Sequence, residues 1–203
     1  MAKIKLYLFP LLILFHVIGV GLFLYFKVAP ELSFLNILMS AIVVFLVEKD
    51  LKKAAIGFSV IFIIGFIIEL IGVQTGYLFG EYIYASSMGP QLFGTPIIIG
   101  ATWYAVIAGA ANIANFVQGS TIAKGIVAGV LAVLMDVLIE QVAIGYNLWQ
   151  WKSGSIPLYN YVCWFIFGSI FAYLYLRITP EKNKLAIQLF CIWIGFFAIL
   201  ALF

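Results

Sequence analysis

Three acidic residues lie within apolar stretches of this sequence, where a carboxyl group needs either a proton or a polar partner. Glu69, Asp136 and Glu140 have no basic residue within one helical turn along the chain. Because an unpaired charge inside a membrane is costly, these residues are candidates for proton chemistry. Asp136 and Glu140 are four residues apart, which places both on one helix face. Their mutual repulsion favours one protonated and one ionised carboxyl group, a pair that can act as acid and base.

Aromatic residues accompany these acids, many of them in two glycine-rich segments, 74–95 and 145–157. Aromatic faces stabilise a cation, most strongly where water is excluded. An acid, a base and aromatic rings together suit the protonation of an alkene to a carbocation and its capture. Each ring taken alone is also typical of core packing or of a membrane interface. The rings are Tyr77, Phe79, Tyr82, Tyr84, Trp103, Trp149, Trp151 and Trp164.

The two aromatic segments are alike in their surroundings. Each follows an apolar stretch that carries acids, and each precedes one that opens with proline. Pro96 lies seven residues before Trp103, and Pro157 lies seven before Trp164. This pattern indicates a weak parallel repeat of helix, aromatic loop and helix, as is common in membrane proteins. The alternative is that interfacial aromatic residues simply recur at membrane surfaces.

The composition is that of a polytopic membrane protein. Of 203 residues, 66% are hydrophobic and 9% are charged, and the mean hydropathy is +1.18. Soluble domains contain about 25% charged residues, so a soluble enzyme, a disordered tail and a nucleic-acid-binding protein are excluded. One histidine, His16, and two cysteines cannot form the usual zinc, haem or iron–sulfur ligand sets. No nucleotide-binding or serine-hydrolase motif occurs, and we expect neither a metal nor a cofactor.

The sequence predicts an all-α membrane protein of about seven transmembrane helices in one domain, 1–203. The first apolar stretch is too long for a signal peptide and is expected to be retained as a helix. The second is short enough to be a tilted or partial span. The seven stretches are 6–26, 32–47, 54–73, 95–116, 121–144, 157–177 and 185–203. The last contains no lysine for a Schiff base, which argues against a retinal protein.

Basic residues predict that the N-terminus is inside and that both aromatic segments are re-entrant or interfacial loops on the outer side. Only Lys27 and Lys152 fall in predicted outer segments. At 1.5 Å per residue, Asp136 then lies about 22 Å and Glu140 about 28 Å from the inner surface, and Glu69 lies about 6 Å below the outer one. The acids therefore converge on the outer half. The inner segments contain Lys3, Lys5, Lys49, Lys52, Lys53, Lys124, Arg177, Lys182 and Lys184.

Other polar residues have simpler interpretations. Asn160 follows Pro157 near the predicted acid layer and is a candidate to orient an acid. Asn112 and Asn115 are expected to form hydrogen bonds between helices, and His16 is expected to be a satisfied core residue. Four further acids lie at segment ends among basic residues, where solvation explains them: Glu31, Glu48, Asp50 and Glu181.

The motifs together resemble a known family. Residues 69–84 read E-x-x-G-x-x-T-G-x-x-F-G-x-Y-x-Y, followed by Gly89-Pro90, Pro96 and Trp103. Further along are Asp136-x-x-x-Glu140, Trp149-x-Trp151, Pro157, Asn160 and Trp164. This pattern resembles the CruF-type membrane carotenoid hydratases, with a family-like core at 54–177. That family usually has a second aspartate at the position of Glu140.

The resemblance implies a hydro-lyase of carotenoid biosynthesis, which adds water across the terminal 1,2 double bond of an acyclic end group. The implied substrates are acyclic or monocyclic carotenoids such as lycopene, γ-carotene or C50 types, with water and membrane lipid as the other partners. The reaction is redox-neutral, so no cofactor is expected, and the expected location is the cytoplasmic membrane of a prokaryote. The predicted catalytic residues are Asp136, Glu140 and Glu69, and the predicted substrate contacts are Thr75, Tyr82, Tyr84, Trp103, Trp149, Trp151, Asn160 and Trp164.

Two other functions use the same features. A carotenoid or isoprenoid cyclase or isomerase would form the same cation but lose a proton instead of gaining water. A proton-coupled transporter would also place acids in its helices, but it predicts acids spread across the membrane depth. A purely structural role leaves three unpaired acids unexplained.

Overall fold

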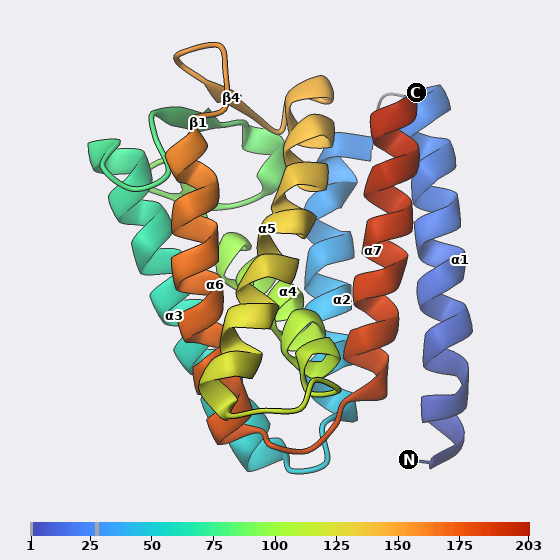
Figure 1. Cartoon of the computed structure of the whole chain (residues 1–203). Coiled ribbons are helices and arrows are strands. Elements are labelled where there is room, and N and C mark those ends of the chain that lie inside the picture. Colours follow the sequence, from blue (N-terminus) through green and yellow to red (C-terminus); the bar gives the residue numbers. More distant parts are fainter. Residues whose placement is uncertain (1, 27–28) are drawn as a thin grey trace.

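A computed structural model describes residues 2–26 and 29–203 and is a bundle of α-helices (Figure 1). The described helices begin and end within a few residues of the predicted apolar stretches. They are α1 (Ala2–Phe26), α2 (Ser33–Val47), α3 (Leu51–Thr75), α4 (Ile99–Ala114), α5 (Thr121–Gly145), α6 (Leu158–Ile178) and α7 (Lys184–Leu202), with two short 3₁₀ helices, η1 (Ala29–Leu32) and η2 (Ser86–Met88).

The helices identify an integral membrane protein. Among the described residues, five helices are long and apolar enough to cross a membrane: α1, α3, α5, α6 and α7. The other two, α2 and α4, contain 15 and 16 residues. The shortness of α2 agrees with the prediction, and the crossing of all seven helices stays a prediction.

Side-chain caps fix several helix ends. Asp50 accepts hydrogen bonds from the first backbone amides of α3, and Ser120 and Asn183 cap α5 and α7 in the same way. Such caps satisfy amides that have no partner within the helix. The helix α3 ends at Gly76, whose φ of 68° lies in the left-handed region. Glycine adopts this conformation without strain, so the chain turns sharply into the first aromatic segment.

The helix α4 lies at the centre of the bundle, and almost all of its side chains are buried. Its small residues permit close approach of the neighbouring helices. A Cβ atom on Gly100 would lie 2.6 Å from the carbonyl oxygen of Phe62 in α3, and one on Gly109 would lie 2.6 Å from the Cβ of Phe190 in α7. The composition of α4 therefore determines how closely α3 and α7 surround the core.

The two aromatic segments meet at one end of the bundle (Figure 1). The strand β1 (Tyr82–Tyr84) pairs antiparallel with β4 (Trp149–Trp151), with Ile83 opposite Gln150. A second pair joins β2 (Gln91–Leu92) to β3 (Thr95–Pro96). These strands were not predicted. The β1–β4 pairing joins equivalent positions of the two helix–loop–helix units, and the equivalent Trp103 and Trp164 stack at 4.0 Å, so the geometry agrees with the proposed repeat.

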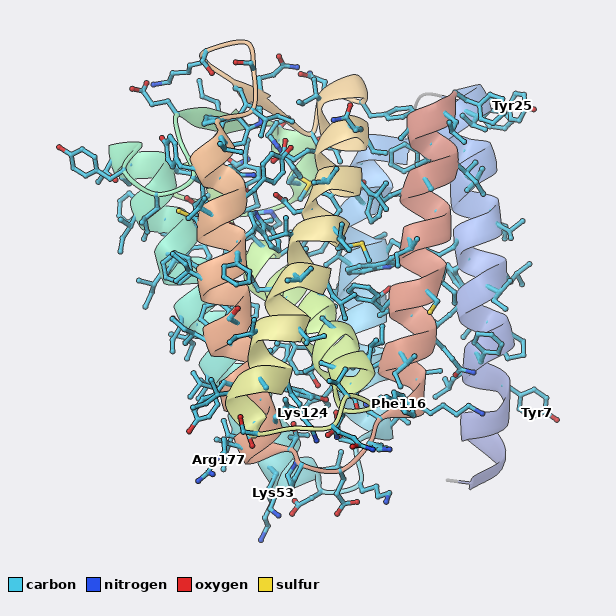
Figure 2. All side chains as sticks on the ribbon, viewed as in Figure 1. Tyr7, Tyr25, Lys53, Phe116, Lys124 and Arg177 are labelled. Carbon is cyan, nitrogen blue, oxygen red and sulfur yellow. The ribbon has the colours of Figure 1, made fainter. Side chains whose placement is uncertain are left out.

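Basic side chains gather at the other end of the bundle. Lys53, Lys124 and Arg177 all lie at the end opposite β1 and β4, where α1 also begins (Figure 2). Lys27, which the charge analysis placed in an outer segment, lies outside the described residues. The uneven distribution of basic residues is therefore visible in the fold as well as in the sequence.

Candidate active site

A cavity of about 590 Å³ lies inside the bundle below the β1–β4 pair. All seven helices and both of these strands contribute to its wall. Every predicted site residue except Thr75 lines it: Glu69, Tyr82, Tyr84, Trp103, Asp136, Glu140, Trp149, Trp151, Asn160 and Trp164. The three acids, which were predicted to converge on the outer half of the membrane, line this one cavity, and their side of the membrane stays a prediction.

Glu69 on α3 accepts three hydrogen bonds. Its Oε2 atom accepts from the hydroxyl groups of Tyr82 at 2.6 Å and Tyr84 at 3.0 Å. Its Oε1 atom accepts from the indole nitrogen of Trp103 at 3.0 Å. The side chain is buried, with 4% of its surface exposed. Three donors around one buried carboxyl group offset part of the cost that burial imposes on its ionised form.

Glu140 on α5 is held by the second strand in a similar way. Its Oε2 atom accepts hydrogen bonds from the indole nitrogens of Trp149 at 3.1 Å and Trp151 at 2.8 Å. The strand β4 thus supplies two donors to Glu140, as β1 supplies two donors to Glu69.

Asp136 is bound differently. It lies one helical turn from Glu140 on the same helix, and its Oδ2 atom accepts a hydrogen bond from the amide of Asn160 at 2.8 Å. No other hydrogen bond to this carboxyl group is formed among the described residues. Its side chain is 1% exposed. Asp136 is therefore the acid with the fewest donors to stabilise a negative charge.

The strand geometry explains how four aromatic donors reach two carboxyl groups. Alternate residues of a strand point to the same side, so Tyr82 and Tyr84 both face the cavity, as do Trp149 and Trp151. Paired residues are also in ring contact, with centroids 5.0 Å apart for Tyr82 and Trp151 and 5.6 Å for Tyr84 and Trp149. The paired strands form an aromatic cap over the acids.

Burial keeps the two tyrosines of the cap in their donor form. Burial, and next the neighbouring Glu69 carboxylate, raise the pKa of Tyr82 and the pKa of Tyr84 well above the ordinary value. Both hydroxyl groups thus stay protonated at neutral pH and remain available to Glu69.

Aromatic faces and the lack of basic side chains define the electrostatics of the cavity. Trp103 stacks on Trp164 with an angle of 19° between the rings, and Phe79 lies 6.4 Å from Trp103 between centroids. Among the described residues that line the cavity, none is basic. No three His, Cys, Asp or Glu side chains of the described chain are arranged to bind a metal ion. The site is thus suited to stabilise positive charge through rings and carboxylates.

Three residues of the first aromatic segment lie outside the cavity. Thr75, a predicted substrate contact, does not line the cavity: its exposed hydroxyl group donates to the carbonyl of Ile71 at 2.6 Å. Tyr77 is 85% exposed because the chain turns outward at Gly76. Glu81 forms a surface ion pair with Lys152 at 3.1 Å.

Glu48 was predicted to be a solvated acid, and this prediction is wrong because the side chain is buried. It is 6% exposed, and it accepts hydrogen bonds from Tyr175 and from the side-chain amide of Asn183. Asn112 donates to Tyr175 and accepts from the backbone of Asn183, so its predicted role between helices is confirmed. This cluster joins α2, α4 and α6 to the start of α7, and it does not line the cavity.

His16 is a satisfied core residue, as expected. Its Nε2 atom accepts a hydrogen bond from the indole of Trp193 at 3.0 Å, and its Nδ1 atom donates to the carbonyl of Leu12. The histidine thereby ties α1 to α7.

The apolar part of the cavity wall was not predicted. It comes mainly from α1, α2 and α7, whose apolar residues give no sign in the sequence of whether they face lipid or a cavity. Examples are Phe15, Ile18, Phe23, Leu38, Met39, Ile42, Trp193 and Phe196.

Comparison with known proteins identifies the family. A family model described as carotenoid biosynthesis protein matches residues 30–203, and the chain belongs to this family. It is also 24% identical over 127 residues to the bisanhydrobacterioruberin hydratase of Haloarcula japonica. That alignment covers 59% of this chain and 43% of the relative, less than half of the relative's length. No solved structure matches. The resemblance to CruF-type carotenoid hydratases is confirmed at the level of the family.

Proposed function

We propose that the protein is a carotenoid hydratase that adds water to the terminal 1,2 double bond of an acyclic end group. The observation that carries this proposal is the cavity in which Asp136, Glu140 and Glu69 face aromatic rings without a basic side chain. The family assignment and the hydratase name of the relative agree with it. The substrate is an acyclic or monocyclic carotenoid, such as lycopene, γ-carotene or a C50 carotenoid.

The first step is proton transfer from the carboxyl group of Asp136 to C2 of the substrate. Asp136 accepts one hydrogen bond, from Asn160, whereas Glu69 accepts three and Glu140 accepts two. Donors stabilise a carboxylate, so the acid with the fewest donors retains its proton most readily. Protonation at C2 breaks the π bond and leaves a tertiary cation at C1.

The second step is stabilisation of that cation. The faces of Trp103 and Trp164 and the carboxylates of Glu69 and Glu140 provide negative electrostatic potential in a site shielded from water. Trp103 is held by its hydrogen bond to Glu69 and Trp164 by stacking on Trp103, so little reorganisation is needed as charge develops.

The third step is attack of water on C1. Glu140 or Glu69 accepts a proton from this water as the carbon–oxygen bond forms, which gives a tertiary alcohol. After water has been added across the double bond, Asp136 has lost a proton and the base, Glu140 or Glu69, has gained one. Transfer of that proton to Asp136, one helical turn from Glu140, restores the starting state.

The proposal includes an orientation in the membrane. The basic residues at the end opposite the aromatic cap support an inner location for that end and an outer location for β1 and β4. The acids then lie in the outer half of the bilayer, and the substrate enters from lipid. The membrane is proposed to be the cytoplasmic membrane of a prokaryote.

A cyclase or isomerase is the second candidate, since the same acid and rings would also form a cation. The location of three acids on one cavity supports an enzyme over a proton-coupled transporter. Glu48 lies near the end of the bundle opposite the aromatic cap, but it accepts a hydrogen bond from Asn183 and does not line the cavity.

Expression in a lycopene-accumulating bacterial host tests the function. Chromatography and mass spectrometry of the pigments should reveal more polar products that are heavier by one or two waters. An isobaric, less polar product would transfer the assignment to a cyclase. Unchanged lycopene, with the protein present in the membrane, would contradict hydration of this substrate.

A further inference from the structure

The cavity continues beyond the acids as an apolar passage between α1 and α2. Residues on both helices line it and are at the same time open to the surroundings of the bundle. Phe15 and Ile18 of α1 are 47% and 51% exposed, and Leu35, Leu38 and Ile42 of α2 are 57%, 36% and 46% exposed. Residues that line a cavity and are also exposed mark its mouth. The mouth therefore opens sideways, on a surface that faces lipid.

The passage has the length and chemistry to hold a hydrocarbon chain. The lining extends from Leu32, the last residue of η1, to Val43 of α2, and on α1 from Phe15 to Phe23. At 1.5 Å per residue these stretches are about 16 Å and about 12 Å long. Away from the acids the lining is predominantly apolar, so contact with a polyene leaves few buried polar groups without a partner.

The wall opposite α2 is held in place by specific contacts. Trp193 of α7 donates to His16 of α1 at 3.0 Å, and the ring of Phe196 meets His16 edge-on with centroids 5.5 Å apart. Phe23 meets Phe196 edge-on as well, at 5.8 Å. These contacts attach α1 to α7 along the side of the cavity. The helix α1 lies outside residues 30–203, which the family model matches.

We infer that this passage is the binding site for the polyene chain of the carotenoid, and that Ile18 and Ile42 at its mouth control entry. The inference rests on the proposed function, because the acids at the closed end receive the reactive end group. The bound chain extends away from the aromatic cap and leaves the protein sideways between α1 and α2. The part of the substrate beyond the mouth remains in lipid.

Two matched pairs of variants test the location of the mouth. Ile42→Trp and Ile18→Trp place a large ring where the passage opens. Ile67→Trp on α3, 45% exposed, and Val17→Trp on α1, 64% exposed, place the same ring on surfaces that do not line the cavity. All four substituted positions are exposed, so the controls reproduce any general effect of adding a tryptophan to the lipid-facing surface.

Two readouts separate binding from chemistry. The first is the amount of lycopene that co-purifies with each variant in an Asp136→Asn background, measured by absorbance per protein. The second is the rate of hydrated product formation by each variant with Asp136 intact. Ile42→Trp and Ile18→Trp should lower both values at least about fivefold, while Ile67→Trp and Val17→Trp leave both within about twofold of their parent.

Each pattern of results leads to a different conclusion. Mouth variants that match their controls in both readouts would overturn the passage while leaving the hydratase proposal intact. Lycopene retention that is sensitive to Ile42→Trp and Ile18→Trp, without any hydrated product, would support the passage and refute the hydratase function. If no lycopene is retained in the Asp136→Asn background and no hydrated product forms with Asp136 intact, both proposals are refuted.

Discussion

Tyr84 of β1 lies opposite Trp149 of β4, and each donates a hydrogen bond to a different buried carboxyl group. The tyrosine hydroxyl reaches Glu69 at 3.0 Å and the indole nitrogen reaches Glu140 at 3.1 Å. One short strand pair thus positions two acids that are carried by different helices. This relationship explains why the aromatic segments recur in the sequence: each supplies donors for one acid.

Asp136→Asn should abolish proton donation while preserving shape. Loss of a general acid typically costs about 100-fold or more in rate, so hydration should fall by at least that factor. The measurement is the initial rate of product formation in membranes with equal amounts of protein. Glu81→Gln is the control, because Glu81 is an exposed acid paired with Lys152, and its rate should not change. Full activity of Asp136→Asn would remove Asp136 from the mechanism.

Tyr82→Phe and Tyr84→Phe each remove one hydroxyl donor from Glu69 and retain the ring. A hydrogen bond to a charged group contributes about 1.5–3 kcal/mol, and about 1.4 kcal/mol corresponds to a tenfold change in rate. We expect each variant to lower kcat about tenfold. Tyr77→Phe changes an exposed ring and should be neutral. Equal rates for all three variants would show that the donors to Glu69 do not contribute.

Trp151→Phe removes a donor to Glu140 and retains an aromatic face. The expected result is a fall in kcat of about tenfold, because Glu140 is less well oriented toward water. Trp193→Phe is the comparison within the same cavity, since this indole donates to His16 and not to an acid. Steady-state kinetics should show a smaller effect on kcat for Trp193→Phe. A larger fall in kcat for Trp193→Phe than for Trp151→Phe would contradict the role proposed for Glu140.

Gly72→Ala should disturb the aromatic cap because the added methyl group would lie too close to neighbouring atoms. A Cβ atom at this position would lie 2.9 Å from the Phe79 ring, 3.0 Å from the carbonyl oxygen of Leu78 and 3.2 Å from the Tyr82 hydroxyl. Overpacking of this kind costs about 1–3 kcal/mol, so both the thermal midpoint and the hydration rate should fall. Gly145→Ala, where a Cβ would meet nothing within 4 Å, is the control. Unchanged activity and an unchanged thermal midpoint in Gly72→Ala would show that the aromatic cap accommodates the added methyl group.

Glu48→Gln should affect stability and not chemistry. Glu48 accepts hydrogen bonds from Tyr175 and Asn183 outside the cavity, and weakening them should cost about 1–3 kcal/mol of folding free energy. A thermal unfolding assay in detergent should show a lower midpoint, whereas the product should be the same. Glu31→Gln, at an exposed position, serves as the control. A changed product from Glu48→Gln would place this acid in the reaction.

The sequence predicts the helices and the meeting of the acids because both follow from local regularities. Apolar length defines a helix in a membrane, and a spacing of four places Asp136 beside Glu140. Asn160 was also found by its position near the acid layer, and the structure places its amide on Asp136.

The remaining features depend on contacts between distant residues. The environment of Glu48 is set by Tyr175, 127 residues away, and not by the adjacent Lys49. Thr75 shares a motif with Glu69, yet it lies outside the cavity, where the helix gives way to the turn at Gly76. The passage between α1 and α2 was missed because residues facing lipid and residues facing a polyene are equally apolar.

If water is added to a carotenoid end group at this cavity, the oxygen of the new hydroxyl group must come from solvent water. The most direct measurement is the mass of the product formed from lycopene by membranes containing the protein, in water labelled with heavy oxygen. We expect a more polar product that carries one labelled oxygen for each hydrated end, and none from Asp136→Asn. An isobaric product without labelled oxygen, or labelled product at an undiminished rate from Asp136→Asn, would contradict the proposed mechanism.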